Sequence, residues 1–304
     1  MKSYNIYLYG MILKTNSFLL ECQYPAADSY GEIHSKYELT GGETGTCATV
    51  LANLGCKVKM DGNHMGRNTY PLIHDFYNER GVDCSRLLYD ENYEGLQDYV
   101  LIDKYTRTCF GTFNHYFSEA KKRWNVPYKE DIEIAKVVGL DPFFDEETRQ
   151  VARWCHELET PYVVIDCPFD DEIHELSSIN VISNEYIQGH YKTWSREEIF
   201  NAYCTHTNGL VILTLGAKEI MYGRKGEVPH FFTPYEVDVV STLGAGDTFK
   251  AGCVYGLLKE MNDNQIVSFA SALAGVACTK FPLPLNPPSL DEIEALIKRG
   301  RESL

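Results

Sequence analysis

The chain reads STLGAGDTF from Ser241 to Phe249. The valine-rich segment Val237–Val240 before it predicts a strand, and the small residues of Lys250–Leu258 after it predict a helix. Two glycines permit a tight turn in which successive backbone N–H groups point the same way. Because this turn opens a helix, the helix dipole also favours an anion there. Strand, glycine turn and helix together predict a phosphate-binding turn in an α/β fold.

Asp247 stands on the first turn of this helix. The ordinary structural role of such a residue is to cap the helix N-terminus. A carboxylate beside a bound phosphate can also take the proton of an attacking hydroxyl. With glycine at about 7% of residues, a Gly-Ala-Gly-Asp run is expected by chance in about one chain in a hundred. We therefore favour a catalytic interpretation of Asp247 over a purely structural one.

Outward from this turn, β-rich runs alternate with helical segments. Strands are expected over Asn5–Leu13, Lys136–Leu140, Tyr162–Asp166, Asn180–Ser183 and Leu210–Leu215, and helices over Thr44–Leu54, Thr69–Arg80, Glu146–Glu159, Ser195–Thr205 and Asp291–Arg299. Near-continuous apolar strands separated by helices predict an α/β fold with a doubly wound, mostly parallel sheet that is flanked by helices.

Two stretches, Ser17–Leu39 and Tyr93–Phe117, break this alternation. They contain many tyrosines and alternating β-formers but no helical period. We expect them to pair as a small β-sheet lid, over about residues 14–40 and 93–117, on a single α/β domain of residues 1–304. The alternative is a pair of ordinary hairpins at the edge of the core.

Several polar residues and glycines follow strands or precede helices. The glycine pair Gly41-Gly42 lies just before a helix, Asn184 follows a strand, and Thr214 and Gly216 end another. Ligands of open α/β sheets bind beyond the carboxyl ends of the strands. Taken together, these positions predict one ligand site along one edge of the sheet.

Composition excludes several classes of protein. The 304 residues include 28 basic and 43 acidic side chains, which gives a net charge of −15. Such an acidic chain lacks the basic surface that nucleic acid binding requires. The apolar run Ile6–Leu13 is too short to span a bilayer or serve as a signal segment. Ten cysteines and nine histidines are dispersed without metal-ligand spacing. We expect a soluble cytoplasmic protein with reduced thiols and no structural zinc.

The order of these pieces resembles the ribokinase (PfkB) family of carbohydrate and nucleoside kinases. The resemblance rests on Gly41-Gly42, the helix end Leu54-Gly55, Gly66–Asn68, Gly81–Asp83, Asn184, Thr214–Gly216 and Gly244–Asp247. The motif TLGAGDTF (242–249) and the spacing from the glycine pair to CATVLANLG (47–55) resemble the ketohexokinase branch more than ribokinase itself.

The resemblance implies phosphoryl transfer from ATP, with Mg²⁺, to a hydroxyl of a sugar or sugar-like acceptor. Asp247 would be the general base, and the backbone of Gly244, Ala245 and Gly246 would form the anion hole. The nucleotide would contact Asn184, Thr214, Gly216, Ala274 and Cys278. The lid would close over the substrate and exclude water, and such lids imply a homodimer.

Several positions depart from the family pattern. The acceptor site would contain Gly41, Gly42, Glu43, Thr46 and either Thr15 or Asn16, of which Thr15 or Asn16 replaces the usual aspartate and Thr46 the usual asparagine. Ser241, Ile187 and Glu219 are also unusual, and Glu185 could substitute near Mg²⁺, through water. We therefore expect an altered acceptor, such as a nucleoside or an amine-bearing sugar near Glu43.

Other interpretations remain open. The departures also fit a non-catalytic or regulatory ligand-binding member of the same fold, or a nucleoside kinase. A dehydrogenase is disfavoured because no GxGxxG follows the first strand. Arg107 in the second lid segment is a candidate for touching substrate, whereas Asp141 and Asp166 are expected to cap strands or loops.

Overall fold

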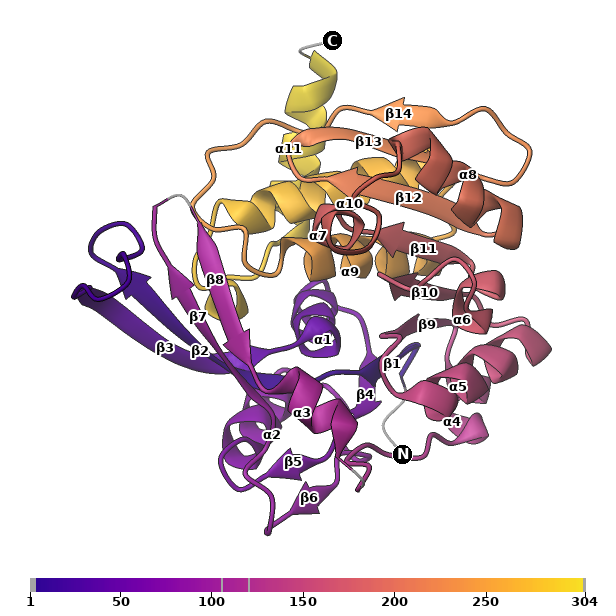
Figure 1. The fold of residues 1–304 in the computed structure, drawn as a ribbon. Coiled ribbons are helices and arrows are strands. Elements are labelled where there is room, and N and C mark those ends of the chain that lie inside the picture. Colours follow the sequence, from indigo (N-terminus) through magenta and orange to yellow (C-terminus); the bar gives the residue numbers. More distant parts are fainter. Residues whose placement is uncertain (1–3, 105, 120, 303–304) are drawn as a thin grey trace.

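The computed structural model describes residues 4–104, 106–119 and 121–302. Tyr105 of the second lid segment and the ends of the expected 1–304 domain therefore lie outside the described residues. An eight-stranded sheet forms the centre of the molecule (Figure 1), in the order β14-β13-β12-β11-β10-β9-β1-β4. Its strands are β1 (Ile6–Gly10), β4 (Val58–Gly62), β9 (Val137–Leu140), β10 (Tyr162–Ile165), β11 (Ile179–Ile182), β12 (Leu210–Leu215), β13 (Lys218–Gly223) and β14 (His230–Phe232).

Six strands of this sheet, β12, β11, β10, β9, β1 and β4, run parallel to one another. At one edge, β13 and β14 are paired antiparallel. The helices are α1 (Glu43–Asn53), α2 (Tyr70–Glu79), α3 (Phe113–Ser118), α4 (Lys129–Ile134), α5 (Asp145–Glu157), α6 (Glu172–Glu175), α7 (Asn184–His190), α8 (Arg196–His206), α9 (Ala245–Leu258), α10 (Asp263–Cys278) and α11 (Leu290–Glu302), with a 3-10 turn at Leu283–Leu285. Two short strands, β5 (Met65–Gly66) and β6 (Tyr89–Asp90), pair beside the main sheet.

Both faces of the sheet are buried, as the expected doubly wound fold requires. Along β1, Ile6 and Leu8 enter the apolar cluster that also contains α1, α9 and α10 residues, whereas Tyr7 and Tyr9 enter the cluster that contains α5 residues. Alternate side chains of a strand point to opposite faces. Continuous apolar strands are therefore needed to fill both layers, and the predicted fold class is confirmed.

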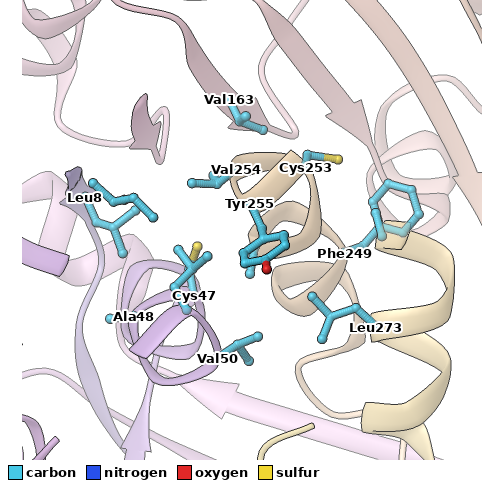
Figure 2. Packing of buried hydrophobic residues seen from close by; sticks show 14 of the residues in the cluster. Leu8, Cys47, Ala48, Val50, Val163, Phe249, Cys253, Val254, Tyr255 and Leu273 are labelled. Atoms are coloured by element: carbon cyan, nitrogen blue, oxygen red, sulfur yellow. The ribbon is translucent and has the colours of Figure 1, made fainter. Parts of the chain in front are cut away.

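The layer between α1, α9 and the sheet positions the glycine turn. Figure 2 shows Cys47 and Val50 of α1 facing Val254 and Tyr255 of α9, all within one buried cluster. The helices α9 and α10 approach closely because a Cβ at Gly252 would stand 2.6 Å from the Ala270 Cα atom. Small residues in α9 thus permit dense packing on two sides.

The lid is a separate four-stranded sheet in the order β3-β2-β7-β8, built from β2 (Leu13–Leu20), β3 (Ile33–Gly41), β7 (Gln97–Ile102) and β8 (Arg107–Gly111). It projects away from the main sheet (Figure 1). The pairing of β2 with β7 is parallel, and the other two pairings are antiparallel. Because the two sequence segments pair with each other, they form one lid sheet instead of two separate edge hairpins.

Three expectations about local structure are wrong. The segment Val237–Val240 is not a strand, since the Val240 amide donates to the Cys278 carbonyl at the end of α10 (2.8 Å) and pairs with no neighbouring strand. The expected strand Asn5–Leu13 ends at Gly10, and Leu13 begins the lid. The helix after the glycine turn begins at Ala245, five residues before Lys250.

Three strands of the main sheet, its two edge strands and the strand next to one edge, escaped the sequence analysis. These strands are β4, β13 and β14, which carry charged or histidine residues among apolar ones. Over the described part of the chain, no helix has both the length and the apolar character needed to cross a bilayer.

Candidate active site

The glycine turn opens α9. Gly244 is the N-cap residue with φ 78°, a left-handed conformation that glycine adopts without strain. The Ala245 amide donates to the Thr242 carbonyl (3.2 Å), so it does not have the free N–H that the sequence analysis gave it. Within the described residues, the amides of Gly244, Gly246 and Asp247 have no acceptor. The turn therefore presents unpaired N–H groups at a helix N-terminus, where an anion can accept them.

A cavity of about 360 Å³ lies between this turn and the lid. Gly244 and Asp247 line it from α9, and Glu43 and Thr46 line it from α1. Gly41, Gly42 and Thr15 complete the set of expected site residues that it brings together. Residues that lie more than 200 positions apart in the chain thus share one enclosed space.

Asp247 is half-buried at this cavity. Burial, followed by the negative charge of Asp141, raises the pKa of Asp247 to about 7, and the positive charge of Lys250 opposes the rise. A carboxylate with a pKa near neutrality can gain and lose a proton at physiological pH. The side chain is therefore suited to accept a proton from a hydroxyl in the cavity.

A buried ion pair lies beneath the turn. Lys250, one helical turn after Asp247, pairs with Asp141 at the end of β9, and both side chains are fully buried. Asp141 also accepts hydrogen bonds from the Met11 amide (2.7 Å), the Thr44 amide (3.1 Å) and the Thr44 hydroxyl (2.8 Å). Burial opposes the charge of Lys250, but Asp141 outweighs that effect and raises the pKa of Lys250. The pair joins β9, α1 and α9.

Sequence reasoning missed this pair. Asp141 was expected to cap a strand end, and Lys250 was treated only as the first residue of a helix. One signal in the sequence was a lysine among the small, apolar residues of α9. A lysine in such a buried segment requires a partner of opposite charge. Asp166, the other strand-end aspartate, has the expected local role: it accepts from the Ser183 amide (2.7 Å) and hydroxyl (2.8 Å).

The α1 side of the cavity is acidic. Burial, then the charges of Asp141 and Asp247, raises the pKa of Glu43 well above its usual value. Gly42 precedes α1 with φ 85°, and a Cβ there would stand 2.5 Å from the Met11 carbonyl oxygen. Only glycine therefore lets the chain enter α1 so close to the end of β1.

The lid contributes one residue that sequence reasoning named and one that it missed. Thr15 lines the cavity, whereas Asn16 lies on the opposite face of β2 and donates to the Asp98 carbonyl (3.0 Å). Asp98, on β7 in register with Thr15, lines the cavity and accepts a hydrogen bond from the Thr15 hydroxyl. Burial raises the pKa of Asp98 to about 6, and the Thr15 hydrogen bond opposes the rise.

The residues expected to contact nucleotide do not line this cavity, whereas Glu185, which was expected near Mg²⁺, does. Asn184 and Glu185 begin α7 beyond β11, and Thr214 and Gly216 end the adjacent strand β12. Cys278 lies next to the turn segment, because its carbonyl accepts the amides of Val240 (2.8 Å) and Ser241 (3.1 Å). The carboxyl edge of the sheet thus lies beside the glycine turn.

Arg107 connects the lid to the turn segment. From β8 it donates to the Thr242 hydroxyl (2.7 Å) and to the Glu185 carboxylate (3.5 Å). Among residues 4–104, 106–119 and 121–302, no group of three or more acidic, histidine or cysteine side chains could hold a metal ion.

Comparisons with known proteins agree with this architecture. A family profile described as "pfkB family carbohydrate kinase" matches residues 33–283. A 5-dehydro-2-deoxygluconokinase of Clostridium botulinum (strain Alaska E43 / Type E3) is 22% identical over 288 residues, which cover 86% of this chain and 85% of that relative. Three relatives that each match 86% of the chain carry this name, so the expected kinship with the ketohexokinase branch is not supported.

Solved structures show the same fold. The structure of Arabidopsis thaliana ribokinase complexed with ribose and ATP superposes with a TM-score of 0.80 and 18% identity, and covers 98% of this chain and 99% of that one. The nucleoside kinase of Methanocaldococcus jannaschii gives a TM-score of 0.75 at 16% identity, with 98% and 99% covered.

Proposed function

The chain belongs to the pfkB family of carbohydrate kinases, which transfer a phosphoryl group to an alcohol, and we propose that it moves the γ-phosphoryl group of ATP to a hydroxyl of a sugar or sugar-like acceptor. The observation that carries this proposal is the position of Asp247. It lies at the cavity, on a turn whose Gly244, Gly246 and Asp247 amides have no acceptor in the described chain.

Asp247 is the proposed general base. A loose phosphoryl-transfer transition state requires positioning and charge stabilisation more than covalent help. The carboxylate would accept the proton of the attacking hydroxyl, and the turn amides would hydrogen-bond the oxygens of the transferred group. The raised pKa of Asp247, about 7, matches this role because the base must release its proton again near neutral pH.

Nucleotide binding is assigned to the neighbouring carboxyl edge of the sheet. Asn184, Thr214 and Gly216 would contact the phosphates, and Ala274 and Cys278 on α10 would lie near the adenine. ATP would supply the phosphoryl group. Mg²⁺ would enter with the nucleotide, since the described residues hold no ready ligand cluster, and Glu185 would approach it through water.

The lid is proposed to close over the acceptor and to pair with a second copy of the chain. Its cavity-facing side carries Thr15 and Asp98. Its other side exposes the cross-strand neighbours Tyr99 and Phe110, which are 45% and 47% exposed. Exposed aromatic side chains on a sheet are typical of a surface that is covered in an assembly.

The test is ATP consumption with a panel of sugars, sugar amines, sugar acids and nucleosides. Asp247→Asn should lower kcat about 10²- to 10⁴-fold with the best acceptor, the usual contribution of a general base. Asp238→Asn removes an exposed carboxylate nine residues earlier and should leave the rate unchanged.

The pH profile adds a second readout. Because the base works deprotonated, kcat/KM of the unsubstituted enzyme should rise about tenfold per pH unit on the acidic side and level off near the Asp247 pKa of about 7. Asp247→Asn should lose this limb. Unchanged turnover in Asp247→Asn, or no turnover with any acceptor, contradicts the proposal.

A further inference from the structure

We infer that Asp98 and Glu43 bind the acceptor, and that this acceptor presents hydroxyl or ammonium donors and carries no anionic group. The inference rests on the proposed function for the position of the acceptor, and it names the acceptor's class. Neither Asp98 nor any lid carboxylate was part of the site that the sequence indicated.

Asp98 has an unused hydrogen-bond acceptor. Its Oδ1 atom is buried and has no partner, while the side chain lines the cavity and takes a hydrogen bond from the Thr15 hydroxyl. Leaving a buried polar atom unpaired is unfavourable, so native proteins rarely do so without a reason. A donor on a ligand in the cavity would satisfy this oxygen.

The lid geometry explains why the carboxylate comes from β7. Thr15 and Asp98 are direct partners in the parallel pairing of β2 with β7. Thr15 stands where related kinases are expected to carry an aspartate, and Asp98 places a carboxyl group one strand away on the same cavity-facing side. The cavity thus retains a lid carboxylate at a shifted position, which suits a different arrangement of substrate hydroxyls.

Glu43 supplies a second carboxyl group from the opposite wall. It begins α1 and lines the cavity, and its carboxyl group accepts a hydrogen bond from its own backbone amide. Burial keeps its pKa well above the usual value. A protonated Glu43 can both donate to and accept from a hydroxyl, and an ammonium group nearby would favour its charged form.

The charge of the cavity decides the acceptor class. Asp98, Glu43, Asp247 and Glu185 line it, whereas its lining from the described chain includes no lysine, arginine or histidine. The two cations whose charges act on Asp247 have other partners: Lys250 pairs with Asp141, and Arg107 with Glu185 and Thr242. Lys14 of the lid pairs with Glu38.

An anionic acceptor would therefore meet repulsion without a compensating cation. At 4 Å a like-charge pair costs about 1 kcal/mol in water and about 4 kcal/mol at an effective dielectric constant of 20. The relatives named 5-dehydro-2-deoxygluconokinases are named for a gluconate derivative, which is a sugar acid. The cavity of this chain indicates a neutral or cationic acceptor instead.

The first experiment compares sugar-like acceptors of different charge. D-fructose, D-glucosamine, D-gluconate and D-fructose 6-phosphate are assayed for ATP consumption, within a wider panel that is grouped by charge. The best neutral or cationic member should have a kcat/KM at least tenfold above that of every acid or phosphate. A sugar acid or a phosphorylated sugar as the best acceptor overturns the inference.

The second experiment compares carboxylate-to-amide variants. Asp98→Asn should raise KM for the best acceptor about tenfold or more, with a smaller change in kcat, because a charge-assisted hydrogen bond is lost. Separately, Glu43→Gln should do the same for an ammonium-bearing acceptor, because the amide cannot become the charged partner that such a group favours. Glu38→Gln is the matched control, since it changes a lid carboxylate that does not line the cavity. Unchanged KM in both cavity variants overturns the inference.

Acceptor-induced thermal stabilisation, measured without nucleotide, separates this inference from the proposed function. If neutral or cationic compounds stabilise the unsubstituted protein but not Asp98→Asn, and no phosphoryl transfer follows, the binding inference holds and the proposed function fails. If transfer occurs with unchanged KM in the variants, the proposed function holds and the inference fails. No stabilisation and no turnover with any neutral or cationic compound overturns both.

Discussion

The floor and the lid of the cavity are held together in different ways. The floor is the start of α9, tied to β9 and α1 by the fully buried Lys250–Asp141 pair. The lid is a four-stranded sheet whose outer side exposes Tyr99 and Phe110. Substitutions in the floor should therefore change the stability of the whole domain, and substitutions in the lid should change binding and turnover alone.

The largest expected effect is on the floor. Lys250→Met keeps most of the length of the side chain but leaves Asp141 as an unpaired buried charge. Breaking one partner of a buried pair costs about 3–5 kcal/mol, so the free energy of unfolding, measured in urea, should fall by that amount. Lys298→Met, an exposed lysine on α11, should change it by less than about 0.5 kcal/mol.

The double variant Asp141→Asn/Lys250→Met checks the cause of this loss. Removing both charges should recover part of the stability, because no uncompensated charge stays buried. A loss below about 1 kcal/mol in Lys250→Met would mean that the pair does not anchor the floor, and the contrast with the lid would fail.

A smaller effect is expected at Gly244, where the floor is proposed to bind the transferred phosphoryl group. Gly244→Ala would strain a residue with φ 78° and place its Cβ 3.1 Å from the Leu283 Cδ2 atom and 3.3 Å from the Thr46 Cγ2 atom. We expect stability to fall by about 1–2 kcal/mol. We also expect kcat to fall about 10²-fold, as on loss of one donor from an anion hole.

Gly226→Ala separates strain from chemistry. Gly226 has φ 80° and no atom within 4 Å of an added Cβ, so this variant should lose similar stability and no kcat. Equal losses of kcat in the two variants would show that Gly244 acts through stability alone.

The same contrast explains what the sequence could reveal. The glycine turn is encoded by consecutive residues, so the turn and the place of Asp247 on the first helical turn could be predicted, although the first residue of the helix and the partner of the Ala245 amide could not. Strand periodicity likewise predicted both buried faces of the main sheet. These features depend on local conformation and on side-chain alternation.

The missed residues depend on pairing between distant segments. Asp98 reaches the cavity only because β7 pairs in parallel with β2, in a register that places it beside Thr15. Lys250 and Asp141 lie 109 positions apart and meet only after the sheet and α9 pack. The false strand at Val237–Val240 has the same origin, since Cys278 of α10 supplies its backbone partner. No local pattern specifies such partners.

The smallest expected effect belongs to the lid. Arg107→Ala removes the hydrogen bond to the Thr242 hydroxyl (2.7 Å) and a partly exposed ion pair with Glu185. Exposed charge pairs contribute about 1 kcal/mol or less, so KM for ATP should rise roughly three- to fivefold. The urea midpoint should stay unchanged, since no buried group loses its partner.

Arg67→Ala is the matched control for this variant, because it removes an arginine in an exposed ion pair with Glu94 that does not touch the turn segment. It should leave both KM and the urea midpoint unchanged. If Arg107→Ala lowered the free energy of unfolding as much as Lys250→Met, the lid would contribute to the stability of the domain. The contrast between floor and lid would then fail, because the contact between Arg107 and the turn segment would stabilise the folded domain as the Lys250–Asp141 pair does.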